Sequence, residues 1–314
     1  MKICVISLEG AAPEIVFGEE RLINVRRLMD LGTYGHLQSM TPPDTGRALM
    51  WMCASRDPGL PGDSELTPIW DQLAHEGRKS ILLGMPPGLP HPIDGICIPD
   101  FRAPGDQFNS SSFPADLEAK LAELFNEYPL TRKSPHAHRN ELQDILSISK
   151  KHWSLAHWLL AEKEWNYFHY LDVGLNEMHE RTGSADGNAL LNYYIWLDEQ
   201  IGELLAVLDS ETVVLLASTR AAQRPEASDP DPDACLRHHQ GIFILAAPNC
   251  PLAGEYSGAH VLDIAPTLLD LAGFAIPVSM QGHSLVTGIE KKPCLSSDEA
   301  DQLIDDRLAG LGYI

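Results

Sequence analysis

The sequence has few basic residues and no long apolar run. Lys and Arg number 23 against 44 Asp and Glu, which gives a formal net charge of −21 at neutral pH. Such a surface repels phosphate backbones, so nucleic-acid binding is not expected. No apolar run approaches the about 18 residues that a membrane-spanning helix needs, so a membrane partner is not expected either.

The sequence also lacks paired cysteines and an N-terminal targeting pattern. The first residues enter a predicted strand directly, without the basic and long apolar regions of a signal peptide. The cysteines are scattered and include no Cys-x-x-Cys pair: Cys4, Cys53, Cys97, Cys235, Cys250 and Cys294. This pattern predicts a reduced cytoplasmic protein with structural thiols.

Strand and helix patterns alternate along the 314 residues, of which 44% are hydrophobic. The chain is long enough for one large α/β domain, residues 1–314. Short runs rich in Ile and Val predict strands at 2–7, 80–83, 96–98, 167–173, 212–217 and 241–246. Helical spacing predicts helices at 24–31, 46–53, 66–77, 114–127, 141–163, 190–208, 260–272 and 301–311. The alternation predicts a mostly parallel central sheet with helices on both faces.

Residues 101–140 are dense in Pro, Ser, Asn and Gly. Because long loops in compact domains usually carry function, residues 88–150 are predicted to form an insertion or cap over the site.

Three polar segments follow predicted strands directly. Glu9 comes after the first strand, Asn176 after the strand at 167–173, and Thr219-Arg220 after the strand at 212–217. Ligands of parallel sheets gather beyond the carboxyl ends of the strands. These positions therefore predict a site at that edge.

Four ordered blocks resemble the alkaline phosphatase superfamily, in its type I phosphodiesterase/nucleotide pyrophosphatase branch. They are residues 3–62, 67–98 and 241–285 and the ending RLAGLGYI, and the segment DIAPTLLDLAGFAIP is the most characteristic. The resemblance implies an alkaline-phosphatase-like fold. It also implies a Thr or Ser nucleophile that attacks a phosphoryl or sulfuryl centre with the help of two metal ions.

The resemblance places Thr45 at the nucleophile position and Arg47 where it could contact an anion. The alternative is that Thr45 caps the helix at 46–53 and that Arg47 is an exposed helix residue. Both roles of Thr45 are compatible, because a nucleophile at a helix N-terminus also gains from the helix dipole.

The implied metal ligands are altered at the first site. Glu9 stands where the family has Asp, and Thr219-Arg220 stands where it has Asp-His. Thr is a poor ligand for divalent ions, and Arg offers only donors. We therefore expect Glu9 and Arg220 to form an ion pair there. The guanidinium would bind a phosphate or sulfate group, with Thr219 beside it.

The second implied metal site is altered as well. Asn176 and Glu180 stand where the family has Asp and His, and His179 lies one position earlier. The last family histidine falls on Arg237, and a shift of one or two residues brings His238 or His239 into place. We expect at most one zinc or manganese ion, or none, from these positions: Glu9, Asn176, Glu180, His238 and His239.

Three functions are compatible with these residues. The first is an atypical, metal-poor or metal-free member that binds a phosphorylated or sulfated small molecule without two-metal hydrolysis. The second is phosphoryl or sulfuryl group transfer in a biosynthetic pathway, with Arg220 stabilising charge and His179 or one of His238 and His239 as general base. The third is a non-catalytic binding or scaffold protein, for which a homo-oligomeric surface would be suitable.

Overall fold

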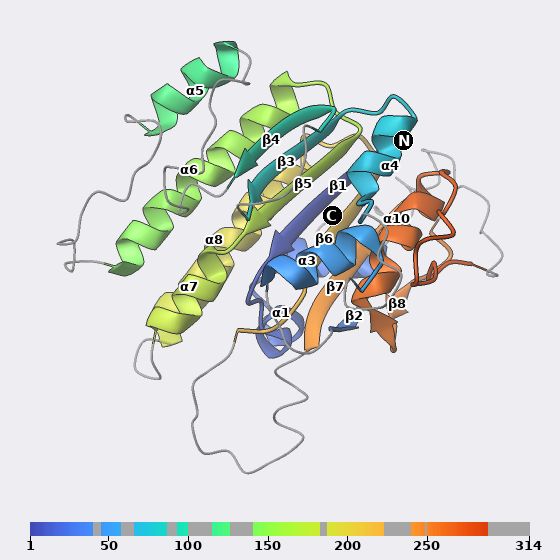
Figure 1. The fold of residues 1–314 in the computed structure, drawn as a ribbon. Coiled ribbons are helices and arrows are strands. Elements are labelled where there is room, and N and C mark those ends of the chain that lie inside the picture. Colours follow the sequence, from blue (N-terminus) through green and yellow to red (C-terminus); the bar gives the residue numbers. More distant parts are fainter. Residues whose placement is uncertain are drawn as a thin grey trace, which may run out of the picture.

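The computed structural model describes residues 1–39, 45–57, 66–86, 93–99, 115–125, 141–182, 187–222, 240–248 and 250–287. Its centre is a nine-stranded sheet of order β4-β3-β5-β1-β6-β7-β2-β8, with β9 beside β2 (Figure 1). The strands are β1 (Lys2–Leu8), β2 (Thr33–Gln38), β3 (Ser80–Met85), β4 (Gly95–Pro99), β5 (Tyr167–Asp172), β6 (Thr212–Ser218), β7 (Gln240–Ala246), β8 (Gly254–Glu255) and β9 (Ala259–His260).

The sheet is mostly parallel, as predicted. Strands β4, β3, β5, β1 and β6 run parallel, and β7 runs antiparallel to both β6 and β2. The sequence prediction missed β2, because its residues TYGHLQ alternate between buried and more exposed positions and form no apolar run. The mostly parallel α/β fold is thereby confirmed.

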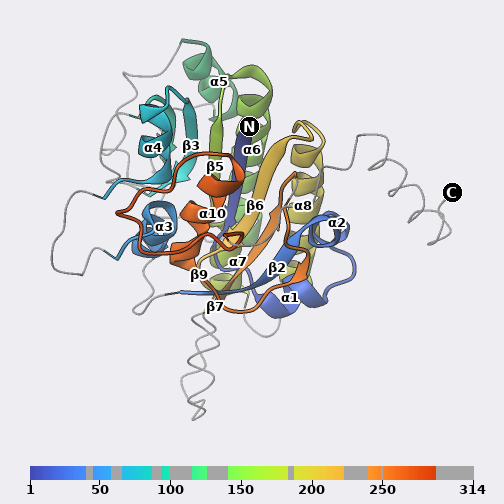
Figure 2. The same ribbon diagram turned by 90° about the vertical axis from the view of Figure 1, so that its right-hand side faces the viewer.

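Helices cover both faces of the sheet (Figures 1 and 2). One face carries α1 (Pro13–Gly18), α2 (Ile23–Leu31), α5 (Ala115–Phe125), α6 (Glu141–Glu162), α7 (Gly174–Arg181) and α8 (Gly187–Leu205). The other carries α3 (Thr45–Ala54), α4 (Ile69–His75), the 3-10 helix Val261–Asp263 and α10 (Ile264–Leu271).

Alternate residues of β1 enter the two cores. Cys4, Ile6 and Leu8 pack on the α6–α8 face, whereas Ile3 and Val5 pack on the α3 face. A strand buried on both faces needs a continuous apolar run, which is why the sequence reveals β1 so clearly.

The predicted cap, residues 88–150, is described only in part. Within it, β4 extends the sheet beyond β3, and α5 packs against α6. The tail helix predicted at 301–311 lies outside the described residues. The cap function of residues 88–150 therefore stays a prediction.

The α2 N-terminus is capped by a residue from α8. Asp198, 3% exposed, accepts hydrogen bonds from the backbone N–H of Asn24 at 3.1 Å and of Val25 at 2.8 Å. The Asn24 side chain donates to the same carboxylate at 3.0 Å. Because α2 has no side-chain cap of its own, this carboxylate satisfies N–H groups that the helix leaves unpaired.

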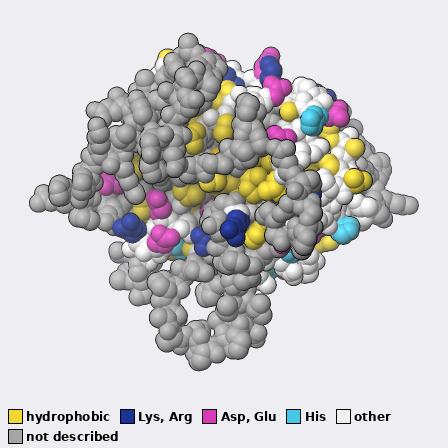
Figure 3. All heavy atoms as spheres, viewed as in Figure 1, with side chains coloured by type: hydrophobic (Ala, Val, Ile, Leu, Met, Phe, Trp, Pro, Cys, Tyr) yellow, Lys and Arg dark blue, Asp and Glu magenta, His cyan; other side chains and the backbone are white. Residues whose placement is uncertain are grey.

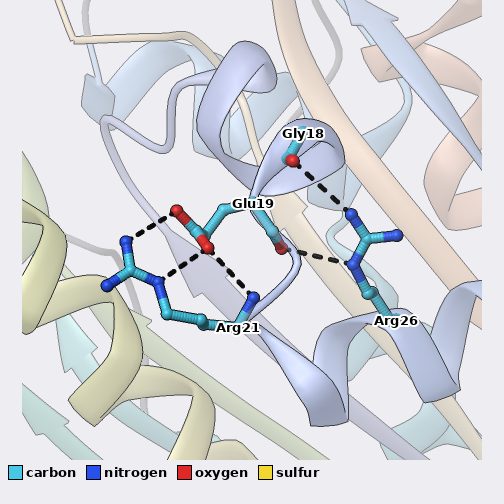
Figure 4. A network of polar contacts seen from close by, with 4 residues as sticks. All are labelled: Gly18, Glu19, Arg21 and Arg26. Atoms are coloured by element: carbon cyan, nitrogen blue, oxygen red, sulfur yellow. Dashed lines mark hydrogen bonds and ion pairs between the residues drawn. The ribbon is translucent and has the colours of Figure 1, made fainter.

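The turn between α1 and α2 is fixed by charged contacts (Figure 4). Arg21 donates to the Glu19 carboxylate through Nε at 2.9 Å and Nη2 at 3.0 Å. Arg26 donates through Nε to the Glu19 carbonyl at 3.2 Å. The hydrogen bonds from Arg21 lower the pKa of Glu19 to about 2.

A polar cluster is buried between the sheet and α3. His169 Nε2 lies 2.8 Å from Ser7 Oγ, and its Nδ1 lies 3.1 Å from the Tyr167 hydroxyl and 3.9 Å from Cys53 Sγ. Both Ser7 and His169 are fully buried. Burial lowers the pKa of His169 to about 3, so the ring is neutral at physiological pH.

The surface and the thiols add two observations. Lys and Arg side chains lie among Asp and Glu side chains on the described part of the face in Figure 3. Four cysteines in the described segments are free thiols: Cys4, Cys53, Cys97 and Cys250. Among the helices of those segments, none is long and apolar enough to traverse a bilayer.

Candidate functional site

Three adjacent parallel strands end side by side and bring the predicted residues together. Leu8 pairs with Asp172 of β5, and Ser7 pairs with Ala217 of β6. The Glu9 N–H donates to the Asp172 carbonyl at 2.9 Å, which extends the pairing one residue past β1. Glu9 and Thr219 therefore meet at the edge that the sequence predicted, because their strands are neighbours.

Glu9 and Thr219 form a buried hydrogen-bonded pair. Thr219 Oγ1 lies 3.1 Å from Glu9 Oε1 and 3.0 Å from Oε2, and the Thr219 N–H lies 3.3 Å from Oε1. Glu9 is 1% exposed and Thr219 is fully buried. Burial raises the pKa of Glu9 to about 7, although the hydrogen bonds from Thr219 and the charge of Arg220 both lower it.

Arg220 lies in a turn held from both sides. The Ser218 hydroxyl donates to the Arg220 carbonyl at 2.6 Å. The next residue, Ala221, donates its N–H to the Gln240 carbonyl at 3.1 Å. These contacts fix the backbone on which the half-buried Arg220 side chain stands.

The ion pair predicted between Glu9 and Arg220 takes a different form. Arg220 is near enough for its charge to lower the pKa of Glu9, but the hydrogen bonds that the described residues give this carboxylate come from Thr219. Thr219 is one residue closer to the strand end, and its hydroxyl and N–H both reach the carboxylate. The expected direct ion pair is thus replaced by a hydrogen-bonded pair with a neighbouring cation.

Helix α7 brings Asn176 and Glu180 beside the loop after β1. Gly10 has a φ of 88°, and a Cβ there would lie 2.8 Å from the Asn176 Cα, so only glycine fits without movement. Asn176 Nδ2 donates to Glu180 Oε1 at 2.7 Å. These two predicted metal ligands hydrogen-bond to each other across one helical turn.

His179 contacts a residue that the sequence did not single out. Its Nε2 lies 2.9 Å from the Tyr194 hydroxyl of α8. The same hydroxyl accepts a hydrogen bond from the Ala12 N–H at 2.9 Å. In the sequence, Tyr194 is one of several apolar-face residues of a helix, so nothing marked it as part of the site.

Asp172 is buried but fully engaged in packing the strand end. Its carboxylate accepts hydrogen bonds from Trp153 Nε1 at 2.7 Å, the Tyr170 hydroxyl at 3.1 Å and the Gly174 N–H at 2.6 Å. It joins β5 to the start of α7 and to α6, and this accounts for its burial.

The remaining predicted residues are less fully described. Helix α3 begins at Thr45, whose side chain lies outside the described residues, and Arg47 is exposed on its first turn. His238 and His239 also lie outside the described residues. Their proposed roles stay predictions.

No family model and no curated protein sequence matches the chain. Solved structures, however, match nearly its whole length. A phosphonate monoester hydrolase from Silicibacter pomeroyi has a TM-score of 0.56 at 14% identity, over 94% of this chain and 78% of that chain. A protein in the alkaline phosphatase superfamily from Vibrio parahaemolyticus has a TM-score of 0.54 at 15% identity, over 95% of this chain and 71% of that chain.

The chain has the fold of the alkaline phosphatase superfamily. A 2-O GAG sulfatase shares it as well, with a TM-score of 0.51 at 14% identity, over 94% of this chain and 76% of that chain. Identities this low establish the fold alone. The narrower phosphodiesterase branch stays a prediction.

Residues around Glu9 do not fit a divalent ion of the kind that the superfamily resemblance implies. Glu9 is the one carboxylate there, it accepts from Thr219, and the neighbouring charge is the cation of Arg220. Within the described segments, no three His, Cys, Asp or Glu side chains gather as a possible ligand set. A set of Asn176 and Glu180 with His238 or His239 stays a prediction.

Proposed function

We propose that the chain binds the phosphate or sulfate group of a small-molecule ester at the ends of β1 and β6, without conventional two-metal hydrolysis. The observation that supports this most is the arrangement of Glu9, Thr219 and Arg220. A carboxylate held by a hydroxyl, with a guanidinium beside it, takes the place of the anionic ligands that the superfamily resemblance implies.

Arg220 is suited to an oxyanion by its chemistry. A guanidinium presents several N–H donors in one plane and binds phosphate or sulfate oxygens in pairs. Because the side chain is half-buried, its charge is less screened than that of a surface arginine. The backbone contacts of Ser218 and Ala221 reduce the freedom of the turn that carries it.

The fold makes phosphate and sulfate the first ligands to test. The names of two proteins with this fold denote a phosphonate monoester and a sulfate ester as substrates. Neither name identifies the organic part of the ligand for this chain.

Thermal-shift measurements with sulfate, phosphate, nitrophenyl phosphate and nitrophenyl sulfate test the proposal. We expect a saturable rise in Tm with at least one of these anions in the wild type, and its loss in Arg220→Ala. Arg27→Ala, an exposed arginine of α2, is the matched control and should behave as the wild type.

Metal content and turnover, measured on the same preparation, decide against the alternative. We expect no hydrolysis that a chelator abolishes. Two metal ions in each chain, together with chelator-sensitive release of nitrophenol, would contradict the proposal.

A further inference from the structure

The hydroxyl of Tyr194 connects three elements at the edge of the site. Tyr194 is 3% exposed on α8. Its oxygen lies 2.9 Å from the Ala12 nitrogen, three residues after Glu9, and 2.9 Å from His179 Nε2 on α7. The His179 and Tyr194 rings meet edge-on, with centroids 5.8 Å apart and planes at 84°. One phenol oxygen therefore links α8, α7 and the loop that follows β1.

The hydrogens of this contact determine the state of the histidine. A tyrosine hydroxyl has one hydrogen to donate and lone pairs to accept with. The Ala12 N–H can only donate, so the phenol oxygen accepts from it. The hydroxyl hydrogen then has His179 Nε2 as its acceptor. If Nε2 carried a hydrogen instead, the contact would leave a buried hydroxyl hydrogen without an acceptor, which folded proteins avoid.

We propose that Tyr194 is a positioning residue of the anion site, which holds neutral His179 in the tautomer with its hydrogen on Nδ1. In this tautomer Nε2 accepts from the phenol, and any further hydrogen bond made through the second ring nitrogen is one that Nδ1 donates. His179 then serves the site as a donor to a ligand oxygen rather than as a general base. This role rests on the proposed binding of phosphate or sulfate.

The chain offers a closely matched control for Tyr194. Tyr193 is the preceding residue on α8, is 2% exposed, and donates its hydroxyl to Ser149 Oγ at 2.7 Å. Tyr193→Phe and Tyr194→Phe each remove one buried, hydrogen-bonded hydroxyl from the same helix. Only the second removes a partner of His179.

Long-range ¹H–¹⁵N NMR of the histidine side chains tests the tautomer, with the His179 signals assigned by their loss in His179→Gln. In the wild type we expect the pattern of an Nδ1–H ring. Tyr194→Phe should change it toward a mixture or the Nε2–H form, whereas Tyr193→Phe should leave it as it is. An Nε2–H pattern in the wild type would overturn the proposal without any variant. So would a His179 pattern unchanged in a folded Tyr194→Phe protein.

Sulfate titrations test the link to the site. Tyr194→Phe should weaken sulfate binding about fivefold relative to Tyr193→Phe, as expected for the loss of one oriented hydrogen bond. Equal affinities would overturn the donor role of His179. If the wild type binds neither sulfate nor phosphate, the proposed function fails, while the NMR pattern still decides whether Tyr194 sets the tautomer.

Discussion

The hydroxyl of Thr219 lies within hydrogen-bond distance of both carboxylate oxygens of Glu9, at 3.1 Å from Oε1 and 3.0 Å from Oε2. The two residues come from the ends of neighbouring strands and are almost completely buried. Their contact leaves Arg220 as the neighbouring cation. The positive charge of this region therefore comes from a side chain that the chain itself supplies.

Thr219→Val should destabilise the protein, because valine keeps the shape of threonine but leaves a buried carboxylate without its hydroxyl donor. We expect a loss of about 1–3 kcal/mol in the free energy of unfolding, measured by urea denaturation.

Thr212→Val, on the same strand, is the control for this change. Thr212 is 5% exposed, and its hydroxyl has no hydrogen-bond partner among the described residues. The control should therefore change stability little. Equal losses in the two variants would show that the Glu9–Thr219 bond contributes nothing.

Glu9 should make stability depend on pH. Its pKa is about 7 in the folded protein against a model value of 4.5, so the folded state binds more protons between these values. The contribution of Glu9 is fully present below about pH 4.5 and is lost as pH rises through 7, at up to about 1.4 kcal/mol per unit. Glu9→Gln removes this loss. Its stability relative to the wild type should rise from about pH 4.5 to 7 and then level off.

Urea denaturation of both proteins across this range measures that difference. A difference that stays the same at every pH would mean that Glu9 is ionised throughout.

His169 should act in the opposite direction. Its pKa is about 3 in the folded protein against a model value of 6.5, because burial disfavours the charged ring. Its contribution to stability is present above about pH 6.5 and is lost as pH falls toward 3. In NMR titrations its ring signals should stay those of a neutral histidine down to about pH 5. A midpoint near 6.5 would contradict the burial of the Ser7–His169 pair.

Asp198→Ala should loosen the start of α2, because the Asn24 and Val25 N–H groups lose their acceptor. We expect a loss of about 1–3 kcal/mol in unfolding free energy and faster hydrogen exchange of these two amides. Asp209→Ala removes an exposed partner of Lys2 and should cost under about 1 kcal/mol. Exchange of the two amides at wild-type rates in Asp198→Ala would refute the capping role.

Sequence patterns predicted the features that depend on neighbouring residues. The continuous apolar run of β1 predicted a central strand, and the position of Glu9 and Thr219 after parallel strands predicted that they meet. The antiparallel β7 was not predicted, because its apolar run is the same whichever direction the strand takes. Tyr194 was missed because its contacts with Ala12 and His179 join residues far apart in sequence.

The most direct test of the account is sulfate titration by calorimetry on protein freed of metal by a chelator. The account predicts saturable binding that survives chelation, is kept in Arg27→Ala and is lost in Arg220→Ala. Binding that disappears on chelation and returns with zinc or manganese, or that persists in Arg220→Ala, would contradict it.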